Sequence, residues 1–118
     1  MQVLIYNIMF NKMAAVSKAC TKLNAEIRVI KNDEIHIPIE ALLTKTSPYK
    51  ENLGKDNEVI PTELLLFDGF SSDDIDLFLE EYNYTNAPKI LYKALVTPIN
   101  RKWTPSYLYK HLQEEVKK

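Results

Sequence analysis

The residues best placed for chemistry are Asp68 and Thr97, because each lies at the end of a predicted strand, the third and the fourth. A carboxylate can act as a general base, and a hydroxyl next to it can bind a substrate. The pair therefore suggests a weak or degenerate enzyme that uses Asp68 near Thr97. Asn7 follows the first predicted strand where a magnesium site would need acids, so the hard oxygen ligands of that metal are missing. The sequence assigns no catalytic residue and favours a non-enzymatic binding domain, with the weak enzyme as the alternative.

The other reactive side chains, Cys20, His36 and His111, have ordinary structural interpretations. Cys20 recurs with apolar residues at helical spacing, which indicates a buried hydrophobe rather than an exposed thiolate. Neither histidine has an orienting partner in the pattern, which a catalytic imidazole needs. The cysteine and the histidines also lack the spacing of metal ligands, so we predict no metal and no cofactor.

Composition indicates one ordinary globular domain over residues 1–118. Of the 118 residues 46% are hydrophobic and 26% are charged, with 15 basic and 16 acidic side chains. This balance argues against a nucleic-acid or anionic-membrane partner, and we read the basic and aromatic C-terminal stretch as a solvated face. The first residues lack a basic leader pattern, and polar residues soon interrupt their apolar run, so we expect a cytoplasmic location.

The predicted fold is α/β, with four strands and three main helices. Four consecutive apolar residues, 64–67, open the stretch 64–70 and indicate a strand that is covered on both faces and breaks into a tight turn, and residues 3–7 form a second run of the same kind. Residues 26–30 and 89–96 read as two further strands. Helical spacing spans residues 10–23, and two later helices are signalled by Ser71 and Thr104 as N-caps. Residues 39–43 can form a short helical segment, and residues 44–58 read as a mobile loop.

The charge pattern predicts the order of the strands. Arg28 and Lys93 interrupt the second and fourth strands, and charged side chains are typical of sheet edges. We therefore expect a small open parallel sheet in the order 2-1-3-4, built from two β-α-β units with helices on both faces.

The stretch from Lys93 to Trp103, with the sequence KALVTPINRKW, resembles a known pattern. It is similar to the hallmark of a bacterial family of domains of unknown function, in which a Lys-Ala strand leads into a Thr, Asn and Trp turn and a closing helix. The segments 67–70 and 4–7 are similar to two other landmarks of that family. The resemblance is strong after Glu63 and weak over residues 33–58. It implies the outline of the fold and no activity.

In an open parallel sheet, ligands bind outside the carboxyl ends of the strands. We therefore predict a ligand site between the first and third strands, suited to a neutral or cationic hydrogen-bonding small molecule or to a partner protein. The alternative is that the same polar residues only cap strand and helix ends. The site is predicted to comprise Asn7, Asp68, Gly69, Thr97 and Asn100.

Trp103 and Asn100 also have a structural interpretation. A large aromatic residue beside a helix start is typical of an anchor that pins the helix to the sheet. Asparagine side chains commonly hold turns by hydrogen bonds to the backbone. We therefore predict that Trp103 is a structural anchor and that Asn100 holds its turn.

Overall fold

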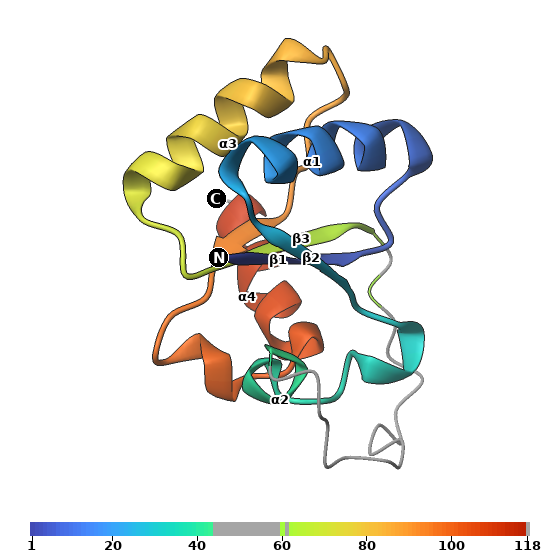
Figure 1. The fold of residues 1–118 in the computed structure, drawn as a ribbon. Coiled ribbons are helices and arrows are strands. Elements are labelled where there is room, and N and C mark those ends of the chain that lie inside the picture. Colours follow the sequence, from blue (N-terminus) through green and yellow to red (C-terminus); the bar gives the residue numbers. More distant parts are fainter. Residues whose placement is uncertain (44–59, 61, 118) are drawn as a thin grey trace.

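The computed structural model describes residues 1–43, 60 and 62–117, so the predicted loop at 44–58 lies outside the described residues. Strands and helices alternate over most of this chain (Figure 1). In chain order the elements are β1 (Gln2–Tyr6), α1 (Phe10–Leu23), β2 (Glu26–Val29), the 3-10 turn η1 (Asn32–Glu34), α2 (Ile39–Leu43), β3 (Leu64–Asp68), α3 (Ser72–Tyr84), β4 (Lys93–Leu95), the 3-10 turn η2 (Asn100–Lys102) and α4 (Pro105–Lys117).

The four strands form one sheet in the order β2-β1-β3-β4, which confirms the predicted order and the predicted edge strands. The prediction that all strands are parallel is wrong. β1 pairs in parallel with β2 and β3 with β4, but the central pair β1 and β3 is antiparallel, with Gln2 opposite Asp68 and Tyr6 opposite Leu64. An unbroken apolar strand shows that both faces are covered, but it carries no information on direction. Here β3 begins at the end of the sheet where β1 finishes.

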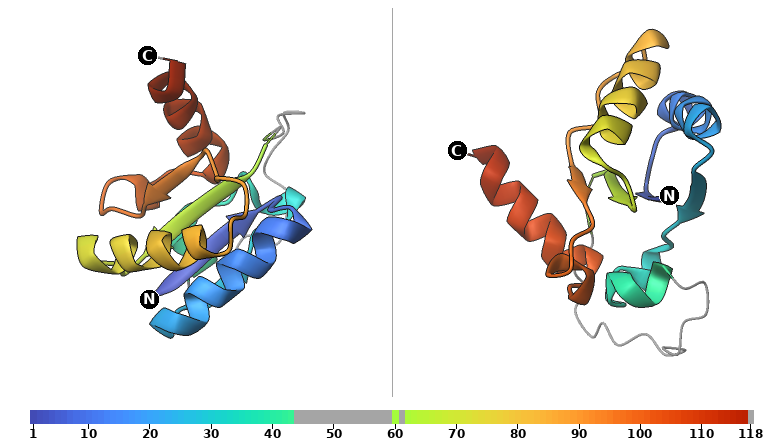
Figure 2. Two further views of the ribbon diagram at one scale, coloured as in Figure 1. Left: turned by 90° about the horizontal axis from the view of Figure 1, so that it is seen from above. Right: turned by 60° about the vertical axis from the view of Figure 1, so that its left-hand side comes forward.

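Helices cover both faces of the sheet, as the sequence predicts. α1 and α3 lie side by side on one face, and α2 and α4 lie on the other (Figures 1 and 2). Alternate residues of the central strands serve the two layers, because successive side chains of a strand point to opposite faces. Val3 and Phe67 face α1 and α3, whereas Leu4 and Leu66 face the opposite layer.

Three phenylalanines form the centre of the α1/α3 layer. The ring centroids of Phe67 and Phe78 lie 5.1 Å apart in an edge-to-face arrangement, and Phe70 lies 5.0 Å from Phe67. Val16 and Cys20 of α1 are buried in the same cluster. This packing brings α3, which follows β3, against α1, which follows β1.

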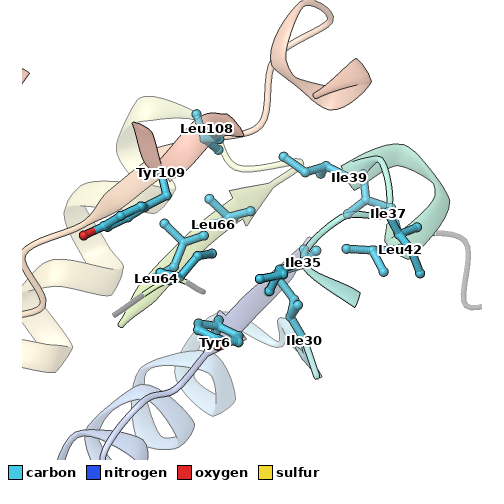
Figure 3. Packing of buried hydrophobic residues seen from close by; sticks show 13 residues of the cluster. Tyr6, Ile30, Ile35, Ile37, Ile39, Leu42, Leu64, Leu66, Leu108 and Tyr109 are labelled. Atoms are coloured by element: carbon cyan, nitrogen blue, oxygen red, sulfur yellow. The ribbon is translucent and has the colours of Figure 1, made fainter. Parts of the chain in front are cut away.

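The α2/α4 layer contains a second cluster of aliphatic residues closed by Tyr6 and Tyr109 (Figure 3). The Tyr6 hydroxyl donates to Asn32 Oδ1 at 2.8 Å, which satisfies its polar end at the rim of the core. Two backbone bonds join the halves of the chain in this layer. Ile39 N donates to the Trp103 carbonyl at 2.8 Å, and Ser106 N donates to the Ile35 carbonyl at 3.1 Å.

Helix ends follow the sequence signals. Ser71 Oγ accepts from Asp74 N at 3.1 Å while Asp74 Oδ2 accepts from Ser71 N at 2.9 Å, so α3 begins with a capping box. Thr104 Oγ1 accepts from Tyr107 N at 3.1 Å at the start of α4. Both predicted N-caps are confirmed. The fourth strand is shorter than the predicted 89–96, because Ile90 turns into the α1/α3 core before the chain pairs with β3.

The phenylalanine cluster gives a stability prediction. Phe78 is fully buried, so Phe78→Ala is expected to lower the free energy of unfolding by about 3–5 kcal/mol through lost burial and a residual cavity. Urea denaturation followed by circular dichroism measures the change. The neighbouring Leu77 is 46% exposed, so the matched control Leu77→Ala is expected to cost less than about 1 kcal/mol. Equal losses in the two variants would contradict this packing.

Candidate functional site

The antiparallel central pair divides the predicted site between the two ends of the sheet. The carboxyl end of β1, followed by Asn7, lies beside the start of β3. Asp68 and Gly69 lie at the opposite end, together with Thr97 after the parallel neighbour β4. The expectation that all five predicted residues meet in one crevice is therefore wrong. Whether any of them binds a ligand stays a prediction.

Asn7 occupies an exposed turn after β1 with a left-handed backbone, at φ 55°. Asparagine tolerates this conformation better than most residues, which gives it a structural reason to be here. A shallow hollow of about 210 Å³ lies next to it and is also lined by Lys12, Thr62 and Glu63.

Asp68 and Gly69 lie at the end of the sheet that contains the first residues of the chain. Asp68 Oδ2 accepts from Gln2 Nε2 at 3.4 Å, and both side chains line a polar hollow of about 300 Å³. Gly69 has φ 75°, a backbone conformation that favours glycine, and an added Cβ would lie 3.6 Å from Met1 Cα. The turn itself therefore accounts for the glycine.

Thr97 and Asn100 form one hydrogen-bonded turn after β4. Asn100 Oδ1 accepts from Thr97 N at 2.8 Å, and Asn100 N donates to Thr97 Oγ1 at 3.1 Å. Asn100 Nδ2 donates to the Leu95 carbonyl at 2.9 Å, and the residue is only 8% exposed. These bonds confirm that Asn100 holds the turn. They also engage both ends of its side-chain amide with the backbone.

Thr97 and Asn100 border a groove of about 400 Å³ between the β4 edge and α4. We call it the β4–α4 groove. Apolar side chains on either side of η2 and on α4 form much of its lining, and charged side chains contribute at Lys93 and Glu115. The apolar and aromatic part comprises Ala94, Ile99, Trp103, Leu108 and Leu112, next to His111.

An aromatic cluster borders the β4–α4 groove. The Trp103 and His111 rings are stacked, with centroids 4.6 Å apart and an interplanar angle of 20°. Tyr107 packs edge-on against both rings, at 5.0 Å and 4.8 Å. Trp103 is half-buried and packs against the α2/α4 core, while His111 is exposed. These contacts, and the bond from Ile39 N to the Trp103 carbonyl, suit the anchor role, whose energetic effect stays a prediction.

The open edge of β4 runs beside this groove. The Tyr92 carbonyl and Val96 N form hydrogen bonds with β3. Because the backbone groups of successive strand residues point to opposite sides, those of Lys93 and Leu95 point away from β3, toward the open edge. Asn100 Nδ2 donates a hydrogen bond to the Leu95 carbonyl, so this carbonyl is not available to pair with a further strand. Apolar side chains stay exposed around it, with Leu95 39% and Ile99 71% accessible.

The remaining reactive residues do not assemble into a metal site. Within the described residues, no group of three or more His, Cys, Asp or Glu side chains is positioned to hold a metal ion. Cys20 is buried, and burial raises the pKa of its thiol to about 11. Among the described helices, none is long and apolar enough to cross a membrane.

Sequence reasoning missed one ionic cluster, at the end of the sheet where β3 begins. Glu63 is 9% exposed and forms an ion pair with Lys12 of α1. One carboxylate oxygen of Glu63, Oε2, is buried without a hydrogen-bond partner among the described residues. An acid directly before a fully apolar strand was the available signal. It was overlooked because its partner lies 51 positions away in the chain.

Comparison with known proteins adds one match. Residues 63–118 match the family described as "Domain of unknown function (DUF3783)". The matched region contains β3, α3, β4 and α4, and therefore every residue that lines the β4–α4 groove. The predicted resemblance to a family of unknown function is confirmed over this region, while bacterial origin and cytoplasmic location stay predictions. No curated protein and no solved structure matches the chain.

The Asn100 hydrogen bonds yield a prediction for the turn. Asn100→Ala removes the partners of Thr97 N and the Leu95 carbonyl, so it is expected to lower the free energy of unfolding by about 1–3 kcal/mol. Thermal and urea unfolding measure the loss. Asn83 is exposed on α3, so the control Asn83→Ala is expected to change stability by no more than about 0.5 kcal/mol. An unchanged melting temperature for Asn100→Ala would show that the turn does not depend on this side chain.

The buried thiol yields a prediction for reactivity. The pKa of Cys20 rises from its usual 9.0 to about 11, so at pH 8 its thiolate fraction falls about 100-fold, and burial blocks access as well. Iodoacetamide is expected to alkylate the native protein at least 100-fold more slowly than the urea-unfolded protein, as followed by mass spectrometry. In a Cys20→Ala background, Ser17→Cys places a thiol on the exposed face of α1 and is expected to react rapidly in the native state. Comparable native rates for the two thiols would refute the burial of Cys20.

Proposed function

We propose that the chain is a small non-enzymatic binding domain that takes an apolar segment of a partner protein in the β4–α4 groove. The observation that carries this proposal is the aromatic stack of Trp103 and His111 beside the exposed Ile99, along an open groove. Partner interfaces are enriched in aromatic residues at their centres and keep charged residues at their rims. The groove has this composition, with Lys93 and Glu115 as its charged residues.

The polar groups that border the groove already form hydrogen bonds within the protein. This favours a partner that inserts an apolar side chain over a polar small molecule. Asn100 was predicted to bind a ligand, and its side-chain amide offers both a donor and an acceptor. Both groups are hydrogen-bonded to the backbone of its own turn. Thr97 also uses its hydroxyl as an acceptor in that turn. Recognition at this place therefore rests mainly on apolar and aromatic contact, which suits an aliphatic or aromatic side chain of a partner.

A small ligand is the second candidate. The groove volume of about 400 Å³ falls within the usual range of small-molecule sites, and its lining mixes apolar residues with a few polar groups. A weak enzyme that uses Asp68 is the less favoured alternative. Asp68 lines a different hollow, beside Gln2, while Thr97 borders the β4–α4 groove.

Peptide selection tests the proposal. Random peptides displayed on phage are selected on the immobilised full chain, and the enriched sequences are synthesised and titrated by nuclear magnetic resonance. We expect enriched peptides to carry aromatic or aliphatic side chains and to shift the resonances of Ile99, Trp103 and His111. Ile99→Asp places a charge in the lining of the groove and is expected to weaken their binding about tenfold or more.

The control uses an exposed apolar residue on another surface. Phe10 is 91% exposed at the start of α1, so Phe10→Asp is expected to leave the affinity of the selected peptides unchanged. Equal affinity of the peptides for the wild type and for Ile99→Asp would overturn the groove as the binding site. If small fragments shift the resonances of these groove residues and no selected peptide does, the small-ligand candidate is favoured.

A further inference from the structure

A second hollow lies beneath α3, on the opposite face of the sheet from the β4–α4 groove. It has a volume of about 190 Å³ and is walled by α3, by β3 and by the segment that leads into β4. We call it the α3 pocket. Its apolar wall is formed by Leu65, Phe78, Leu79, Tyr82 and Ile90.

The apolar wall is closely packed. Phe78 is fully buried within the phenylalanine cluster, and Ile90 is 2% exposed. Tyr82 is also buried, and its hydroxyl donates to the Pro88 carbonyl, which closes the connection between α3 and the following segment. These buried residues form the packed floor of the pocket, and the partly exposed Leu79 offers apolar surface at its wall.

Two lysines supply the charged part of the α3 pocket, and Asn83 adds an uncharged amide. Lys93 and Lys89 both line it, and the Lys93 ammonium donates to the Ile90 carbonyl. Burial lowers the pKa of Lys93, and the nearby positive charge of Lys89 lowers it further. Neither lysine forms an ion pair within the part of the chain that the structure describes. The pocket thus holds two cations that repel each other.

The nearest carboxylate does not neutralise these cations fully. Glu63 raises the pKa of Lys93, so its charge reaches the pocket, but its ion-pair partner is Lys12. Lys12 also donates to the Lys89 carbonyl at 3.2 Å, which holds the pair beside the pocket rather than inside it. With Glu63 paired to Lys12, the lining of the pocket keeps an excess of positive charge.

We propose that the α3 pocket binds a small monocarboxylate with a short apolar chain. The carboxylate lies between the ammonium groups of Lys89 and Lys93, and the chain lies against Leu79 and Ile90. Charge-assisted hydrogen bonds to a carboxylate are the strongest contacts that a lysine makes with such a ligand. A carboxylate in this place also relieves the repulsion between the two lysines.

The surroundings select a monoanion with a short chain. Asp76 and Glu80 lie exposed on the same helix, outside the pocket lining, and their negative charge repels a doubly charged phosphate that approaches α3 more than a singly charged carboxylate. The volume of about 190 Å³ is below the range of drug-sized sites, so a long chain does not fit. The α3 pocket therefore suits a smaller ligand than the β4–α4 groove of about 400 Å³.

Nuclear magnetic resonance with hexanoate as the probe tests the proposal on the full chain. We expect hexanoate to shift the methyl resonances of Leu79 and Ile90 with a dissociation constant on the order of 1 mM. Hexanamide and hexylammonium, which keep the chain but lose the negative charge, are expected to bind about tenfold more weakly or worse. Inorganic phosphate, which lacks the chain, is expected to leave both methyl resonances unchanged.

Two variants locate the charge requirement. Lys89→Gln changes an exposed side chain without disturbing the core, and Lys93→Gln removes the partly buried ammonium; each is expected to weaken hexanoate about tenfold. Lys18→Gln, on the exposed face of α1, is the matched control and is expected to leave the affinity unchanged. Equal binding of hexanoate and hexylammonium, or unchanged affinity in folded Lys89→Gln, would overturn the proposal.

Discussion

The antiparallel pairing of β1 with β3 at the centre of the sheet determines where every other part of the molecule lies. Each of these strands begins a β-α-β unit with its own parallel neighbour, β2 or β4. Because the two units run in opposite directions, the carboxyl ends of β1 and β2 lie at one end of the sheet and those of β3 and β4 at the other. Polar residues after the strands are consequently divided into two groups, and no single crevice collects them.

The two layers of helices hold this arrangement through different kinds of contact. On one face, the phenylalanine cluster of β3 and α3 packs against α1, so the two units share one apolar core. On the other face, backbone hydrogen bonds from Ile39 and Ser106 join the segment after β2 to the segment around α4. The second set of bonds fixes Trp103 where its ring reaches both the core and the β4–α4 groove.

The two hollows on the opposite faces of the family-matched region, residues 63–118, differ in their chemistry. The β4–α4 groove is open and bordered by stacked rings, so it offers contact area with few unused hydrogen-bonding groups. The α3 pocket is smaller and combines an apolar wall with two lysines. Lys93 belongs to the lining of both, because it lies on the edge strand β4, which borders both hollows. A substitution of Lys93 therefore affects both hollows. A substitution of Ile99 tests the β4–α4 groove alone, and one of Lys89 tests the α3 pocket alone.

The sequence by itself determined the features that depend on local pattern. The helix of residues 10–23, the N-caps Ser71 and Thr104, and the turn held by Asn100 follow from periodicity and from side-chain to backbone bonding over a few residues. The strand order also followed from the sequence, because Arg28 and Lys93 are tolerated only where a strand has a solvated edge.

Only the tertiary structure decided the direction of β3 and the residues that gather at each hollow. A strand buried on both faces needs the same apolar side chains in either direction, so the run of residues 64–67 could not distinguish a parallel from an antiparallel partner. The ion pair of Lys12 with Glu63 and the stack of Trp103 on His111 depend on how helices dock on the sheet. No local sequence pattern predicts such contacts, because they depend on the three-dimensional packing of the elements. Only the tertiary structure therefore shows them.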